Sequence, residues 1–168
     1  MADQDMRKVI SVLLALLILA FEGALAEAGH VNPWTPTTAQ GLMDALGLQL
    51  GLPDGATNVT WQMHRAEQMG QVTFTWQGED YTARIAPADV FEDISGLYYE
   101  WEAEDKCEVG RCKGVVRRAH DGENTVDVCL WYDDPTGLMY SVSVIGADLD
   151  GFDITAAADK LYIPMQTE

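Results

Sequence analysis

Three glutamates, Glu100, Glu102 and Glu104, occupy every second position of one segment. If residues 97–104 form a β-strand, these carboxylates share one face, because side chains at i, i+2 and i+4 point the same way. Glycosidases use two carboxylates about 5–10 Å apart, a spacing that same-face neighbours can meet. The alternative is a solvated acidic strand, which discourages edge-to-edge pairing of sheets. These glutamates therefore support a glycan-directed hydrolase as the second functional hypothesis, behind a binding domain.

A second chemical candidate is the segment 93–96 (DISG), which contains a carboxylate and a hydroxyl. A nucleophilic serine needs a positioned histidine, and no spacing pattern places one beside Ser95. A Gly-x-Ser-x-Gly elbow is also absent from the sequence. We interpret Asp93, Ser95 and Gly96 as a turn in which side-chain oxygens bind backbone amides. Arg84 is the expected ionic partner of this turn, from an adjacent strand.

Acidic residues gather again at Asp148, Asp150 and Asp153. A helix–loop–helix calcium site needs an acid or amide at its fifth position and a glutamate at its twelfth. Counted from Asp148, those positions hold Phe152 and Asp159, so the pattern fails. We interpret the loop as acidic capping of the last helix, with weak calcium binding as the alternative. The sequence indicates no cofactor.

Two aromatic residues, Tyr98 and Trp131, point opposite to the clearest apolar positions of their segments, in contrast to most of the other aromatic residues. If the sheet is covered on one face only, both side chains are exposed. An exposed aromatic pair beside Glu100 and Glu102 is the expected binding surface. Burial under a helix is the alternative for both aromatic residues.

Three cysteines favour one disulfide and one remaining thiol in an exported protein. Cys107 and Cys112 flank a turn-like spacer, Glu-Val-Gly-Arg, so strands on either side of it would bring the two Cβ atoms together. A Cys107–Cys112 bridge is expected, with Cys129 as a buried free thiol. Pairing of Cys112 with Cys129 is the alternative. A zinc site is poorly supported, because the single C-x4-C lacks a matched pair of histidines.

The first 26 residues have the form of a signal peptide. Two basic residues precede an apolar segment, 9–21, and Ala24-Leu25-Ala26 supplies the small-x-small cleavage pattern. The apolar segment is shorter than the ~20 residues of a membrane-spanning helix. We therefore expect cleavage after residue 26, secretion of a single domain at 27–168, and no membrane insertion after cleavage.

The charge of the chain limits its partners. The 168 residues have a formal net charge of −17, of which residues 1–26 carry −1, so the secreted part keeps −16. Nucleic acids and anionic membranes require clustered basic residues, and the one small cluster, at 111–118, does not reverse the field. An extracellular or envelope ligand is expected. The sequence does not specify the oligomeric state.

Hydrophobic periodicity predicts a helix, about seven short strands and a closing helix. Because every expected strand connection is short, the strands should pair as an antiparallel meander. We predict an α+β domain with one curved sheet and both helices packed on it; a closed β-sandwich is the alternative. The predicted elements are a helix at 37–50, strands near 59–63, 72–76, 81–85, 97–104, 114–119, 125–132 and 138–145, and a helix at 154–165.

These motifs together resemble a family of uncharacterised extracytoplasmic domains of Gram-positive bacteria. The resemblance depends on the DISG turn with its following aromatic residues, on Arg84, Pro53 and Trp131, and on the segment 137–143 (GLMYSVS). It covers most of the chain after the leader and implies a secreted protein, a lipoprotein or the outer domain of an anti-sigma factor. Since the chain shows no cytoplasmic domain or membrane helix, sigma-factor regulation is not expected. A secreted, non-enzymatic binding or sensing domain is the leading hypothesis, and a structural module of a surface assembly is a third.

Overall fold

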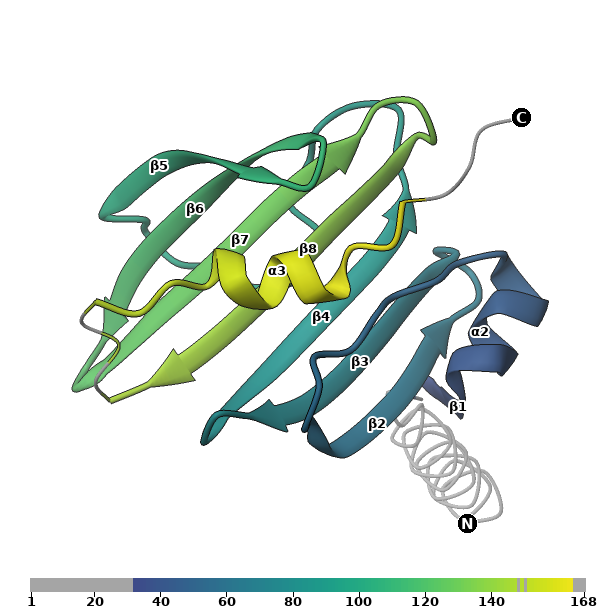
Figure 1. The fold of residues 1–168 in the computed structure, drawn as a ribbon, viewed down its shortest axis with the longest axis horizontal. Coiled ribbons are helices and arrows are strands. Elements are labelled where there is room, and N and C mark those ends of the chain that lie inside the picture. Colours follow the sequence, from purple (N-terminus) through teal and green to yellow (C-terminus); the bar gives the residue numbers. More distant parts are fainter. Residues whose placement is uncertain (1–31, 148, 150, 165–168) are drawn as a thin grey trace, which may run out of the picture. The chain divides into compact units, whose positions relative to one another are not determined.

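The computed structural model describes residues 32–147, 149 and 151–164, and its compact unit begins at Trp34. Within these residues, eight strands form one antiparallel sheet accompanied by two short helices (Figure 1). The elements in chain order are β1 (Thr35–Thr37), α2 (Ala39–Leu46), β2 (Thr57–His64), β3 (Met69–Trp76), β4 (Glu79–Pro87), β5 (Ala103–Val109), β6 (Cys112–Asp121), β7 (Asn124–Asp133), β8 (Leu138–Gly146) and α3 (Thr155–Leu161). The predicted signal peptide lies outside the described residues.

The sheet consists of two four-stranded meanders placed side by side. Strands β1 to β4 pair in sequence, as do β5 to β8, and the halves join where β4 pairs with β8. The expected antiparallel, β-rich architecture is confirmed, but the sheet has eight strands and its order is not that of one simple meander. The last strand, rather than the next one, pairs with β4.

A long connection, residues 88–102, makes this order possible. It leaves β4 near the middle of the sheet and enters β5 at the far edge. Four strand spacings of about 4.8 Å separate these strands, or roughly 19 Å. A fifteen-residue segment can span roughly 50 Å when extended. The connection is therefore long enough to cross one face of the sheet.

The predicted strand at 97–104 is wrong, because residues 88–102 contain no strand and β5 begins only at Ala103. Ile94 and Trp101 of the connection pack against the sheet face formed by Val128 and Leu130. The alternating apolar residues therefore come from a segment that lies across the sheet, not from a strand within it. A segment that lies on an apolar sheet face and a strand within a sheet can both show alternating apolar and polar residues.

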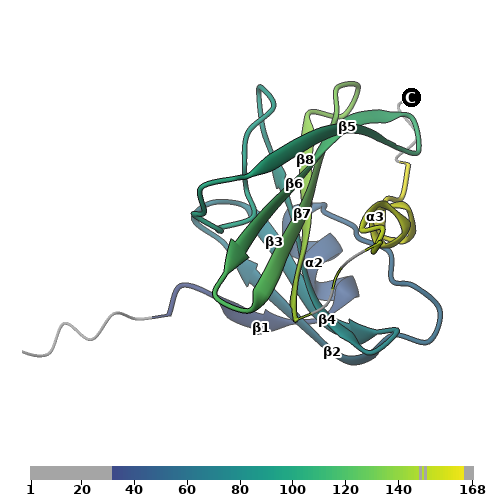
Figure 2. The same cartoon turned by 90° about the vertical axis from the view of Figure 1, so that its left-hand side faces the viewer.

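Both helices cover the opposite face of the sheet (Figure 2). Leu42 of α2 and Leu161 of α3 belong to one core with Phe74, Tyr81 and Tyr140 from the sheet. Both helices are shorter than predicted. Helix α2 begins after Thr38, whose Oγ1 accepts a hydrogen bond from the Gly41 amide at 3.0 Å. This bond satisfies one of the amides that a helix start leaves unpaired.

Candidate functional site

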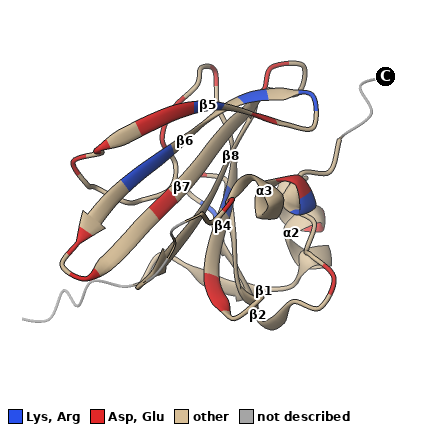
Figure 3. Cartoon of the chain, turned by 60° about the vertical axis from the view of Figure 1, so that its left-hand side comes forward, with Lys and Arg blue, Asp and Glu red and all other residues tan. Residues whose placement is uncertain are grey.

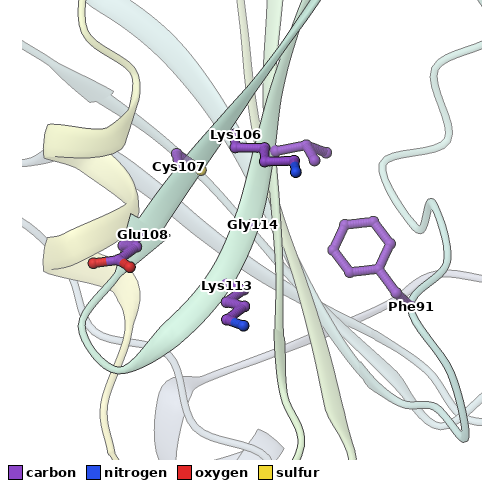
Figure 4. A pocket seen from close by; sticks show the side chains of 7 residues that line it. Phe91, Lys106, Cys107, Glu108, Lys113 and Gly114 are labelled. Carbon is purple, nitrogen blue, oxygen red and sulfur yellow. The ribbon is translucent and has the colours of Figure 1, made fainter.

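A cavity of about 760 Å³ lies between the β5–β6 hairpin and the connection 88–102. Figure 4 shows Phe91 on one side of this space and the hairpin residues Lys106 and Lys113 on the other. We call it the Phe91 cavity. Its lining residues are Phe91, Lys106, Cys107, Glu108, Lys113, Gly114 and Val115.

The hairpin register explains why two lysines face this cavity. Lys106 pairs with Val115, and Lys113 pairs with Glu108, so these four residues occupy one face of β5 and β6. No ion pair within 4 Å involves either lysine among the described residues. The Phe91 cavity therefore offers two ammonium groups beside one carboxylate, in a chain whose net charge is −17.

The apolar wall of the cavity comes from the connection 88–102. Phe91 is 41 % exposed and its neighbour Val90 is 64 % exposed. The connection is fixed elsewhere by Ile94, which is buried against the sheet. Exposed apolar side chains on an anchored loop, beside a cavity, are typical of ligand-binding surfaces.

Arginine and acidic side chains alternate on the strands near the cavity. Figure 3 shows basic residues on β6 between acidic residues of β5 and β7. Arg117 contacts Glu104 at 2.7 Å and Asp93 at 3.2 Å. Arg118 binds Asp127 through two hydrogen bonds of 2.7 Å. These arginines are engaged by carboxylates of the domain.

The glutamates considered for hydrolysis do not share one strand face. Glu104 lies on β5, whereas Glu100 and Glu102 belong to the connection that precedes it. Glu102 lies 2.8 Å from His120, and Glu104 lies 2.7 Å from Arg117. The same-face geometry that motivated a two-carboxylate site is therefore wrong. The cause is the later start of β5.

The segment 93–96 forms a turn closed by its own side chains. Asp93 Oδ1 accepts hydrogen bonds from the Ser95 amide at 2.9 Å and from Ser95 Oγ at 2.6 Å. Ser95 Oγ in turn accepts a bond from the Leu97 amide at 3.2 Å. Ser95 is 5 % exposed, and its hydroxyl group is engaged in hydrogen bonds within the turn.

Arg84 reaches this turn, although it is not the ionic partner of Asp93. Its Nη1 donates to the Ile94 carbonyl oxygen at 3.2 Å, and its Nε donates to Gln71 Oε1 at 2.8 Å. The carboxylate of Asp93 binds Arg117 instead. Burial lowers the pKa of the Arg84 guanidinium from its ordinary value, partly offset by nearby acidic groups. Arg84 therefore holds the turn through a backbone carbonyl.

Replacing Gly96 with alanine is expected to destabilise the turn by about 1–3 kcal/mol, because this residue has φ +72° and a Cβ would lie 2.1 Å from Arg84 Nη1. Gly122→Ala is the matched control, since its φ is +64° but nothing lies within 4 Å of the added atom. Chemical denaturation measures both variants. Equal losses would show that the contact with Arg84 contributes nothing.

Tyr98 and Trp131 do not form an exposed pair. Tyr98 is 96 % exposed, but Trp131 is fully buried and stacks on Tyr140 with ring centroids 5.1 Å apart. The prediction that Trp131 belongs to a binding surface is wrong. Trp131 does point opposite to Val128 and Leu130, but its own face is the one that the helices cover.

The predicted Cys107–Cys112 disulfide is also wrong, because all three cysteines are free thiols. The two-residue turn between β5 and β6 pairs Cys112 with Val109, whereas Cys107 pairs with Gly114. The alternative bridge from Cys112 to Cys129 is not formed either. The two thiols in contact are those of Cys107 and Cys129, with 3.7 Å between their sulfur atoms.

The acidic loop near the last helix shows no metal site within the described residues. Asp148 and Asp150 lie outside them. Asp153 Oδ1 accepts a hydrogen bond from the Thr155 amide at 3.0 Å, at the start of α3. No group of three or more potential metal-ligating side chains occurs in the part of the chain that the structure describes.

The Phe91 cavity was not predicted from the sequence. Lysines are rare in this acidic chain, and the close spacing of Lys106 and Lys113 was an available signal. The position of Phe91 could not be inferred from that spacing, because it depends on the path of residues 88–102.

In the described residues, no helix is long and apolar enough to cross a membrane.

Comparison with known proteins identifies no relative: no family model, no curated protein and no solved structure matches this chain.

Proposed function

We propose that this chain is an exported, non-enzymatic binding domain of the cell envelope, and that the Phe91 cavity is its ligand site. The observation that carries the proposal is the cavity itself, which combines an exposed phenylalanine with two lysines that form no ion pair with any described residue. Its volume of about 760 Å³ lies within the range of small-molecule sites. Export is proposed from the leader pattern of residues 1–26.

The charges and the apolar wall define the class of ligand. An ammonium group without a carboxylate partner attracts anions, and lysine is a frequent phosphate binder. Phe91 offers apolar contact to the remainder of the ligand. Because the whole chain carries −17, extended polyanions are repelled at long range. We infer a small ligand with one localised anionic group, such as a carboxylate or phosphate ester, attached to an apolar group.

Replacing both Lys106 and Lys113 with glutamine is expected to weaken binding of phenyl phosphate about tenfold or more, because a charge-assisted hydrogen bond contributes about 1.5–3 kcal/mol. Titration calorimetry of the purified protein measures the affinity, and amide chemical shifts locate the site. Benzyl alcohol, which lacks the anionic group, serves as the comparison probe.

Lys160→Gln provides the control for loss of a lysine outside the cavity, because it removes one positive charge from the exposed side of α3. This variant should bind phenyl phosphate as the parent protein does. Equal binding of phenyl phosphate and benzyl alcohol, or an equal loss in the Lys160 variant, would contradict the proposed site.

A glycan hydrolase remains the second candidate function, on the observation that Glu100, Glu102 and Glu104 are all exposed at one end of the hairpin. The contacts of Glu102 with His120 and of Glu104 with Arg117 favour a structural role for these two. Release of sugars from cell-wall glycan by the purified protein, lost on Glu100→Gln and Glu102→Gln, would favour the hydrolase over the binding domain.

A further inference from the structure

Two thiols from non-adjacent strands meet on the helix-covered face of the sheet. Cys107 lies on β5 and Cys129 on β7, with β6 between them. Their sulfur atoms are 3.7 Å apart. This contact is distinct from both pairings that sequence spacing suggested, and it does not depend on the proposed ligand.

Gly114 of β6 makes the contact possible. It pairs with Cys107 on one side and with Trp131 on the other. A Cβ at this position would lie 3.0 Å from Cys107 Sγ and 2.5 Å from the Leu130 carbonyl oxygen. Because the middle strand carries no side chain here, the Cys107 side chain lies over it and reaches Cys129.

The two thiols differ in accessibility. Cys129 is fully buried, whereas Cys107 is partly exposed. A hydrogen bond with Cys129 lowers the pKa of the Cys107 thiol, which favours its thiolate. Burial raises the pKa of the remaining thiol, Cys112, which is 4 % exposed. Cys107 is therefore the thiol that a reagent reaches, and Cys129 is the thiol that lies behind it.

We propose that Cys107 and Cys129 form a redox pair that a disulfide-class oxidant converts into a cross-link between β5 and β7. The Cys107 thiolate attacks one sulfur atom of the oxidant and breaks its S–S bond, which forms a mixed disulfide and releases one thiolate that takes up the proton lost by Cys107. Cys129 Sγ then attacks Cys107 Sγ and transfers its proton to the second departing thiol. Two cysteine thiols are oxidised, and one molecule of the oxidant is reduced to two thiols.

Forming this bond requires strands β5 and β7 to move closer together. The sulfur atoms must approach from 3.7 Å to about 2.0 Å, and the Cα atoms must come within about 7 Å. Strand β5 is the edge of the sheet and pairs on one side only, with β6. Its outer side therefore has no ladder that the movement would break, and only its ladder with β6, which lies between β5 and β7, has to bend.

Treating the purified protein with oxidised glutathione tests the proposal. Trypsin cleaves after Lys106, Arg111, Lys113 and Arg118, so each cysteine falls on a separate peptide. Mass spectrometry without reduction should find the peptide of Cys107 joined to that of Cys129, with Cys112 free. The cross-link should raise the melting temperature by about 5–10 °C, because it closes a loop of residues 107–129.

Cys112→Ser is the matched control, and it should form the same cross-link with the same rise in melting temperature. Cys107→Ser should abolish both, and the reduced form of each variant reports whether the substitution itself disturbs folding. Joining of Cys107 to Cys112, or persistence of the mixed disulfide with glutathione at Cys107, would overturn the proposal. Retention of three free thiols after oxidation would overturn it as well.

Discussion

Replacing Trp131 with alanine is expected to lower the free energy of unfolding by about 3–5 kcal/mol, the usual range for deleting a buried aromatic side chain. Trp131 is fully buried and stacks on Tyr140 with an interplanar angle of 7°. Its removal leaves a cavity in the core between the sheet and α3, which the rigid sheet cannot close. Guanidinium or urea denaturation measures the loss.

Tyr98→Ala is the matched control for this prediction. Tyr98 is 96 % exposed, so its truncation should change the free energy of unfolding by less than about 0.5 kcal/mol. Sequence alternation grouped these two aromatic residues on one exposed surface, whereas the structure separates them completely. Similar losses in the two variants would show that Trp131 does not occupy the core position described above.

Replacing Asp127 with alanine is expected to cost about 3–5 kcal/mol, because it removes two charge-assisted hydrogen bonds of about 1.5–3 kcal/mol each from a buried position. Asp127 is 1 % exposed and accepts hydrogen bonds of 2.7 Å from both Arg118 Nε and Nη2. Nη2 also donates to the Leu149 carbonyl oxygen, so the arginine connects β6 and β7 to the segment before α3. Chemical denaturation at neutral pH measures the loss.

Glu104→Ala tests whether this cost comes from burial. Glu104 also binds an arginine at 2.7 Å, but its side chain is 54 % exposed, and exposed ion pairs contribute about 1 kcal/mol or less. A second test replaces Asp127 with leucine and Arg118 with methionine together, which should recover much of the stability. The prediction is contradicted if Asp127→Ala costs no more than Glu104→Ala, or if the double replacement recovers nothing.

Local patterns predicted the strands well where each strand pairs with its neighbour in sequence. The alternation at 72–76 and 138–145 corresponds to β3 and β8, and a two-residue turn, Gly122-Glu123, joins β6 to β7. The pairing of β4 with β8 could not be predicted in the same way. It joins segments about sixty residues apart, and no local pattern specifies which distant strand fills that position.

The path of residues 88–102 explains most of the sequence-based predictions that the structure contradicts. This connection contributes the apolar residues that looked like a strand, covers the face containing Val128 and Leu130, and presents Phe91 to the hairpin. Both faces of the sheet are covered at β7, so a side chain of this strand is buried whichever face it points to. The prediction of an exposed Trp131 failed for this reason.

The sequence by itself determined the properties that depend on neighbouring residues: the acidic charge, the strand periodicity, the hairpin turns, and the hydrogen-bonding residues of the turn at Asp93 and Ser95. The tertiary structure alone decided which thiols touch, which aromatic residue is buried, and which lysines border a cavity. These features arise from contacts across Gly114 and across the connection 88–102. Such contacts join residues distant in sequence, so their geometry is set only when the sheet has assembled.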